Sequence, residues 1–153
     1  MIENKILTFT LDEPRYALPL PAVERVLRAV EITPLPKAPE IVLGVINVQG
    51  ELLPVLDIRR RFRLPLRGLE PGDRLIIART SKRRVLLPAD AVTGVHELSG
   101  SELVSAEKAV PFAPYLAGVA KLESGLVFIH DLEQFLSIDE EKLLAEALRG
   151  DAV

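Results

Sequence analysis

Asp57 and Asp131 are the first side chains in this sequence that could do chemistry, because each ends an apolar run in one of two similar segments. Two carboxylates can share the roles of acid and base in a reaction. An aspartate at such a place can also cap a short helix by accepting hydrogen bonds from its first free amides. Capping accounts for both residues and for their equivalence, so a catalytic carboxylate pair is not expected.

His96 and His130 are the only histidines, and the chain has no cysteine. Neither histidine belongs to a cluster with the spacing of metal ligands. The sequence also lacks a Ser-His-Asp arrangement and a glycine-rich phosphate loop in front of a helix. We therefore expect no metal, no cofactor and no catalysis.

The strongest charge cluster consists of four arginines, Arg59, Arg60, Arg61 and Arg63. Such a cluster can bind phosphates, which makes a nucleic-acid-binding β-barrel the main alternative function. A solvated face on a short helix is the simpler interpretation. The net charge of −3 and the shortage of aromatic residues, with two tyrosines, five phenylalanines and no tryptophan, argue against a nucleic-acid partner.

An internal repeat indicates which elements position these residues. Residues 16–26 align without a gap on residues 85–95, at a separation of 69 residues. A second block, which begins at Gly44 and includes Asp57, aligns on residues from Gly118 to Asp131 at a separation of 74. Two copies at this spacing predict two similar small subdomains rather than a solenoid. The seam between them is the expected place for binding, and a small-molecule enzyme with a site there is the third alternative.

The elements within each copy read mostly as short strands. Residues 6–11 and 15–19 resemble a hairpin that residues 74–78 and 84–87 repeat. Residues 44–57 read as strand, tight turn and strand, with Gly50 at a positive φ. We therefore predict a mostly β fold of two small β-barrels, because closing a sheet removes its edges.

The chain is expected to be one domain, residues 1–153, with two packed subdomains at roughly 15–70 and 75–137. Exchange of strands between the subdomains is left open. A capping box at Ser137 predicts a C-terminal helix over 138–149. Its apolar face is expected to dock on the body, with a partner-binding helix as the alternative. Short apolar runs and the absence of cysteine favour a cytoplasmic protein without direct membrane insertion.

Residues 44–59, Gly-Val-Ile-Asn-Val-Gln-Gly-Glu-Leu-Leu-Pro-Val-Leu-Asp-Ile-Arg, resemble the central motif of the CheW-like domain family. The resemblance extends over about residues 5 to 137. It implies two SH3-like β-barrels around a shared core. It also implies an adaptor of bacterial chemosensory signalling, whose partners are the regulatory domain of a CheA-type histidine kinase and the cytoplasmic tip of a chemoreceptor.

Two positions depart from the family pattern. Gln49 replaces the arginine of the central motif, and Arg25 stands where the family has an acidic residue. Arginine offers a charged, forked donor that glutamine does not have. Both positions lie in regions that the family uses for partner contacts, so the resemblance implies a divergent adaptor with its own kinase or receptor.

The candidate partner-binding residues come from two segments, residues 23–28 and residues 44–50. Around the first, an exposed Val23 would form an apolar patch with a charged border, whereas Val26 and its equivalent Val95 are expected in the core. In the second, Gln49 is the better contact candidate, because turn chemistry alone accounts for Gly50, whereas turn chemistry and a contact role explain Asn47 equally well. The full set is Val23, Glu24, Arg25, Arg28, Gly44, Asn47, Gln49 and Gly50.

Overall fold

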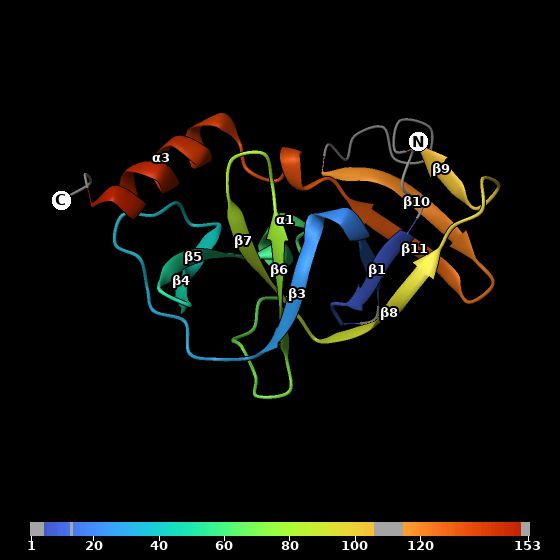
Figure 1. Cartoon of the computed structure of the whole chain (residues 1–153), viewed down its shortest axis with the longest axis horizontal. Coiled ribbons are helices and arrows are strands. Elements are labelled where there is room, and N and C mark those ends of the chain that lie inside the picture. Colours follow the sequence, from blue (N-terminus) through green and yellow to red (C-terminus); the bar gives the residue numbers. More distant parts are fainter. Residues whose placement is uncertain (1–4, 13, 106–114, 151–153) are drawn as a thin grey trace.

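The computed structural model describes residues 5–12, 14–105 and 115–150, and it contains two β-sheets that lie side by side (Figure 1). The five-stranded sheet has the order β3-β6-β7-β5-β4, and the six-stranded sheet has the order β8-β1-β2-β11-β10-β9. The mostly β architecture predicted from the sequence is confirmed.

The five-stranded sheet consists of β3 (Val23–Arg28), β4 (Val42–Val48), β5 (Glu51–Leu56), β6 (Arg74–Arg79) and β7 (Arg84–Ala89). The six-stranded sheet consists of β1 (Lys5–Thr10), β2 (Arg15–Pro19), β8 (Ala91–Glu97), β9 (Leu103–Ser105), β10 (Leu116–Leu122) and β11 (Gly125–His130).

The five-stranded sheet curls into a barrel, called here the first barrel. Thr33 and Val45 exchange backbone hydrogen bonds of 3.0 and 2.8 Å, so the segment after β3 meets the far edge strand β4. In the six-stranded sheet, the second barrel, β9 takes the equivalent place beside β10, where Val104 pairs with Val119. The same order of strands therefore occurs twice, as the repeat predicts.

The two repeat copies exchange their hairpins. β1 and β2 belong to the first copy, yet they pair with β8 and β11 of the second copy. Likewise β6 and β7 of the second copy pair with β3 and β5 of the first copy. Each barrel is thus one copy completed by the hairpin of the other, and the two sheets do not divide the chain into the ranges 15–70 and 75–137.

The strands of the exchanged hairpins are apolar along most of their length. The reason is that alternate side chains of one strand face different cores, so both faces of the strand are buried. On β6, Leu75 and Ile77 point into the first barrel, whereas Ile76 and Ala78 point into a core shared by both barrels. On β1, Leu7 and Phe9 enter the same shared core, and Ile6 enters the second barrel. The hairpins at the centre of the molecule are therefore buried on both faces.

The helices are short except at the C-terminal end. α1 (Ile58–Arg61) is capped by Asp57, and the 3₁₀ turn η2 (Leu132–Gln134) is capped by Asp131, as predicted. A third short turn, η1 (Leu20–Ala22), leads from β2 into β3. η1 and α1 lie between strands, whereas η2 lies between β11 and the terminal helix, and none of the three is long enough to stand without the sheets.

The terminal helix α3 (Ile138–Arg149) has the bounds expected from the sequence and docks on the body (Figure 1). Its capping box at Ser137 is formed in both directions. Leu144 is 0% exposed and packs in the shared core, whereas Leu143 faces solvent. Ion pairs from Arg61 to Glu140 and from Arg83 to Glu141 hold its first turn.

Among the described residues, no helix is long and apolar enough to cross a membrane.

Candidate functional site

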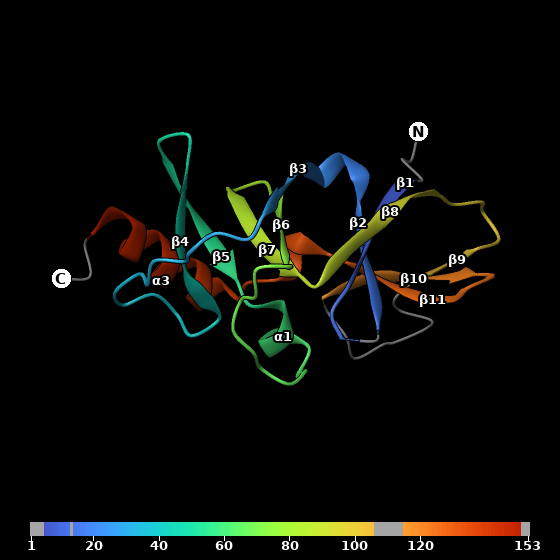
Figure 2. The same cartoon turned by 90° about the horizontal axis from the view of Figure 1, so that it is seen from below.

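Predicted contact residues from both segments meet at one end of the first barrel, where β3 and β5 begin and β4 and β6 end, although Arg28 and Gly44 lie elsewhere. We call this end the rim surface and define it as Val23–Arg25, Gln49–Glu51, Arg79 and Arg84. The β4–β5 hairpin reaches this end of the barrel in Figure 2. The register of the sheet supports this grouping, because Arg79 pairs with Arg84 and Val48 pairs with Glu51.

Arg84 connects the two predicted segments. Its Nε donates a 2.9 Å hydrogen bond to Glu24 of β3, and its Nη1 donates to Glu51, directly after the β4–β5 turn. One guanidinium therefore lies between the segment around Val23 and the turn around Gln49. A forked, planar cation suits such a bridge, because it bonds two carboxylates in fixed directions.

Glu24 is the second member of this bridge and also receives two hydrogen bonds from Arg79, at 3.0 and 2.5 Å. The bonds from Arg79 are the main cause that lowers the pKa of the Glu24 carboxyl, burial opposes them, and the bond from Arg84 adds to the lowering. The glutamate is therefore ionised at neutral pH and holds two arginines in place at the solvent boundary.

The turn between β4 and β5 has two residues in the left-handed conformation, Gln49 with φ +52° and Gly50 with φ +88°. Two positive φ values form the type I′ turn, which matches the twist of a hairpin. Asn47 accepts a 2.8 Å hydrogen bond from the amide of Gly50, so turn chemistry occupies its side-chain oxygen. Gln49 is exposed and adopts a conformation that costs a non-glycine residue free energy, which is common at contact sites.

Of the remaining predicted residues on β3, Arg25 and Arg28 are exposed, whereas Val23 is half-buried against the shared core. Arg25 has no ion-pair partner within the part of the chain that the structure describes. Arg28 lies at the opposite end of the strand, where it pairs with Arg74. The rim surface therefore includes Arg25 but not Arg28.

Among the predicted contact residues, Gly44 has a clear structural role. It is buried with φ +152°, and a Cβ placed on it would lie 2.3 Å from the carbonyl oxygen of Thr33. The glycine lets the chain after β3 approach β4 and close the first barrel. Its place in the sequence motif therefore has a structural reason.

The expectation for the repeated valines is wrong at one position. Val26 is half-buried and packs on the shared core, but Val95 is 57% exposed. Val95 lies on the edge strand β8 and pairs with Leu7 of β1.

Sequence reasoning missed Arg79, Arg84 and Glu51 at the rim. These residues stand at the ends of strands that lie next to each other only because the hairpins are exchanged. A signal was present, since Arg84 aligns on Arg15 at the repeat separation of 69 residues.

The arginine cluster is a solvated face only in part, because Arg63 is exposed whereas Arg59 and Arg61 are built into the protein. Arg59 is 7% exposed, and Arg61 donates to Glu140 and lies over the rings of Tyr115 and Phe135, at 5.1 and 5.4 Å from their centroids. Arg60 makes a 3.4 Å ion pair with Glu40. Arg59 and Arg61 join distant parts of the chain, so the four arginines do not form one common phosphate-binding surface.

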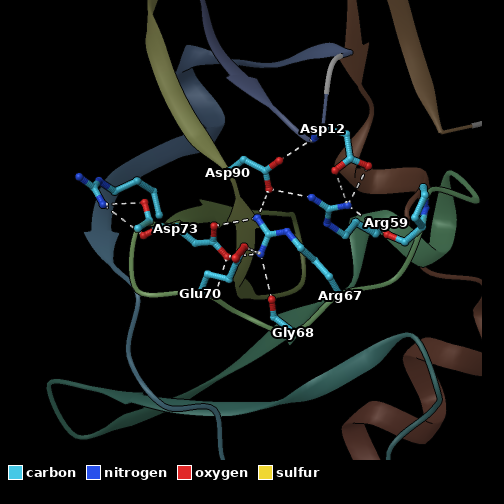
Figure 3. A network of polar contacts seen from close by, with 10 residues as sticks. Asp12, Arg59, Arg67, Gly68, Glu70, Asp73 and Asp90 are labelled. Atoms are coloured by element: carbon cyan, nitrogen blue, oxygen red, sulfur yellow. Dashed lines mark hydrogen bonds and ion pairs between the residues drawn. The ribbon is translucent and has the colours of Figure 1, made fainter.

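Arg59 belongs to a polar network in the seam between the barrels (Figure 3). It donates 3.0 Å hydrogen bonds to Asp12 of the β1–β2 turn and a 2.8 Å bond to Asp90, between β7 and β8. Arg67 bonds the same Asp90 and also Asp73, whose pKa is lowered mainly by the Arg67 hydrogen bonds. The network joins three loops across the seam, and its charges are paired with each other.

No group of histidine, cysteine and acidic residues that could hold a metal exists in the part of the chain that the structure describes. His96 is partly exposed on β8, whereas His130 is 1% exposed inside the shared core. His130 is surrounded by the rings of Phe9, Tyr16 and Phe62, and burial lowers its pKa to about 3. The histidines therefore do not form a common site.

Comparisons with known proteins agree with this geometry. The CheW-like domain family matches residues 5–140. The chain is 27% identical to the chemotaxis protein CheW of Thermotoga maritima, over 88% of each chain. It is 31% identical to the protein FrzA of Myxococcus xanthus, over 67% of this chain and 64% of FrzA.

The fold has a close structural counterpart. The crystal structure of the scaffolding protein TtCheW from Thermoanaerobacter tengcongensis superimposes with a TM-score of 0.81 and 28% identity, and the match covers 91% of this chain and 96% of that one. The family match spans nearly all of the described residues, both barrels included. This chain belongs to the CheW-like domain family.

Proposed function

We propose that this protein is a non-enzymatic scaffold that couples chemoreceptors to a CheA-type histidine kinase in bacterial chemosensory signalling. Family membership and the likeness to a scaffolding protein support this role. The rim surface supports it further, because it combines exposed charges with a turn that holds the exposed Gln49 at a positive φ. Such a scaffold works in the cytoplasm, where the kinase and the receptor tips are found.

The observation that carries the proposal is the Glu24–Arg84–Glu51 bridge. It fixes the β4–β5 turn against the start of β3, so Arg25 and Gln49 are presented together on a rigid barrel end. Fixed side chains lose little entropy on binding, which favours a protein-protein contact. We assign the rim surface to the regulatory domain of the kinase. The receptor tip would then bind elsewhere, near the seam between the barrels.

The test is isothermal calorimetry of the full chain with the regulatory domain of a chemosensory kinase from the same organism. Charge reversal by Arg25→Glu should weaken binding by about tenfold, because it places a like charge beside Glu24 and changes the rim potential. Arg28→Glu is the matched control on the same strand and should stay within about twofold. Absence of binding by the unmodified chain to every such kinase would remove the proposal.

The nucleic-acid alternative predicts that binding depends on the salt concentration. A barrel that used the arginine cluster would bind oligonucleotides with an affinity that falls steeply as salt rises. The ion pairs of Arg59 and Arg61 occupy two of the four cations that this alternative would use.

A further inference from the structure

The two barrels place an equivalent arginine at equivalent ends, with different partners. Arg84 begins β7 and Arg15 begins β2, and the two are 69 residues apart in the repeat. Arg84 is bonded to the carboxylates of Glu24 and Glu51. The first barrel thus shows which chemical group this arginine position takes, which is a carboxylate.

The second barrel lacks both of those carboxylates. The residue equivalent to Glu24 is Thr93, and the residue equivalent to Glu51 is Gly125. Arg15 makes a single hydrogen bond among the described residues, a 2.8 Å bond to the hydroxyl of Ser124. A Cβ on Gly125 would lie 3.7 Å from Nη2 of Arg15, so the glycine leaves open the place from which Glu51 bonds in the other copy.

Arg15 also lines a groove. The groove has a volume of ≈ 500 Å³ and is bounded by β8 and by the β10–β11 turn. Thr93 and Val95 line it from β8, Leu122 lines it from the end of β10, and Ser124 lines it from the β10–β11 turn. Val95 is an exposed apolar residue, so the groove combines a cation, hydroxyls and an apolar wall.

Two acidic residues of the groove do not take the place of the missing partners. Glu102 accepts a 2.8 Å hydrogen bond from the amide of Ser99 and lies 3.7 Å from Nε2 of His96. Glu123 is exposed beside the turn. Neither makes an ion pair with Arg15 in the part of the chain that the structure describes.

We infer that the groove at the end of the second barrel binds an acidic side chain of a partner protein, with Arg15 as the anchor that receives the carboxylate. The apolar wall at Val95 favours a protein segment over a free anion. Arginine is one of the residue types that dominate the binding energy of protein-protein contacts, and there it is surrounded by well-packed neighbours. The inference goes beyond the proposed function, which assigns nothing to this barrel, and it does not depend on which kinase or receptor the protein serves.

The experiment is a nuclear magnetic resonance titration of the full chain that follows the Nε–Hε signal of Arg15. The probes are a blocked pentapeptide with one central glutamate, the same peptide with glutamine, and free glutarate. The glutamate peptide should shift the Arg15 signal, and the glutamine peptide should not. A response to free glutarate that equals the response to the peptide would overturn the assignment to a protein partner.

Three variants complete the test. In Arg15→Gln, which lacks the guanidinium signal, binding is followed through the backbone amide signals of the groove residues Thr93 and Ser124, and affinity for the glutamate peptide should fall by about tenfold because a charge-assisted bond is lost. Thr93→Glu should abolish it by supplying in the same chain the carboxylate that Glu24 supplies in the first barrel, whereas the matched neutral change Thr93→Gln should preserve it. Equal peptide binding by Thr93→Glu and Thr93→Gln, or no Arg15 response to any probe, would contradict the inference.

Discussion

Val26 of β3 pairs with Ile76 of β6, although the two residues belong to different copies of the internal repeat. The equivalent of Val26 is Val95, and it pairs with Leu7, the equivalent of Ile76. The pairing is therefore reciprocal, and neither barrel contains strands from one copy only. Because the buried hairpins face both a barrel interior and the shared core, the rim surface is held by the whole molecule rather than by a separate lobe.

Replacing Gly44 is expected to lower the free energy of unfolding. In the variant Gly44→Ala, the new Cβ would meet the Thr33 carbonyl in a backbone conformation that alanine rarely adopts. We predict a loss of about 3 kcal/mol in the free energy of unfolding, measured by urea denaturation. Gly100→Ala is the control, since nothing lies within 4 Å of its Cβ position, and it should change stability by less than about 1 kcal/mol.

Arg59 should contribute to stability through the seam. Replacement by methionine leaves Asp12 and Asp90 without their shared cation, although Arg67 still bonds Asp90. We predict a loss of about 2–3 kcal/mol by thermal or urea unfolding, because carboxylates that lose a partner keep their desolvation cost. Arg63→Gln, at an exposed position of the same cluster, should cost less than about 0.5 kcal/mol. Similar losses in both variants would show that the seam network is not what Arg59 stabilises.

The terminal helix offers two neighbouring leucines with opposite surroundings. Leu144 is fully buried in the shared core, whereas Leu143 is 45% exposed. Leu144→Ala should lower the free energy of unfolding by about 2–4 kcal/mol through the cavity it leaves, and Leu143→Ala should change it by less than about 1 kcal/mol. If both variants unfolded at the same urea concentration as the parent, the helix would not be docked in solution.

His130 predicts a specific dependence of stability on pH. Its pKa is about 3 in the folded protein because of burial, against about 6.5 for an exposed histidine. The unfolded chain therefore binds a proton below pH 6.5 that the folded chain does not. Stability present above pH 6.5 should fall on acidification toward pH 3, by about 1.4 kcal/mol per pH unit from this residue alone.

The matched variant for this prediction is His130→Leu, because the equivalent position in the first copy is the buried Leu56. Carboxyls with lowered pKa values, such as Asp73 and Glu140, also lose stability on acidification, so the comparison is between the two slopes. Denaturation between pH 6 and pH 4 should give a smaller slope for the variant. Identical slopes would mean that His130 is protonated in the folded state.

Much of the fold could be predicted because its signals are local. The cap at Asp57, the positive φ of Gly50 and the capping box at Ser137 each depend on a few consecutive residues, and all three are confirmed. The repeat also predicted two similar barrels. It did not predict the exchange of hairpins, because a copy that pairs with itself and a copy that pairs with its neighbour have the same sequence pattern.

The candidate site was harder to predict for the same reason. Glu24 and Gln49 were named from the sequence, but their connection passes through Arg84, which comes from the other copy. The role of Gly44 needed the position of Thr33, a contact between the closing segment and β4. The arginine cluster looked basic in sequence because its acidic partners, such as Asp90 and Glu140, come from distant loops and from α3.

The most direct measurement of the central claim is co-sedimentation of a CheA-type kinase with membranes that contain its chemoreceptor, with and without this protein. A scaffold that binds both partners should increase the amount of kinase recovered with the membranes, and Arg25→Glu should reduce that increase while the protein itself still sediments with the receptor. Kinase recovery that is the same in the absence and presence of the protein would contradict the account.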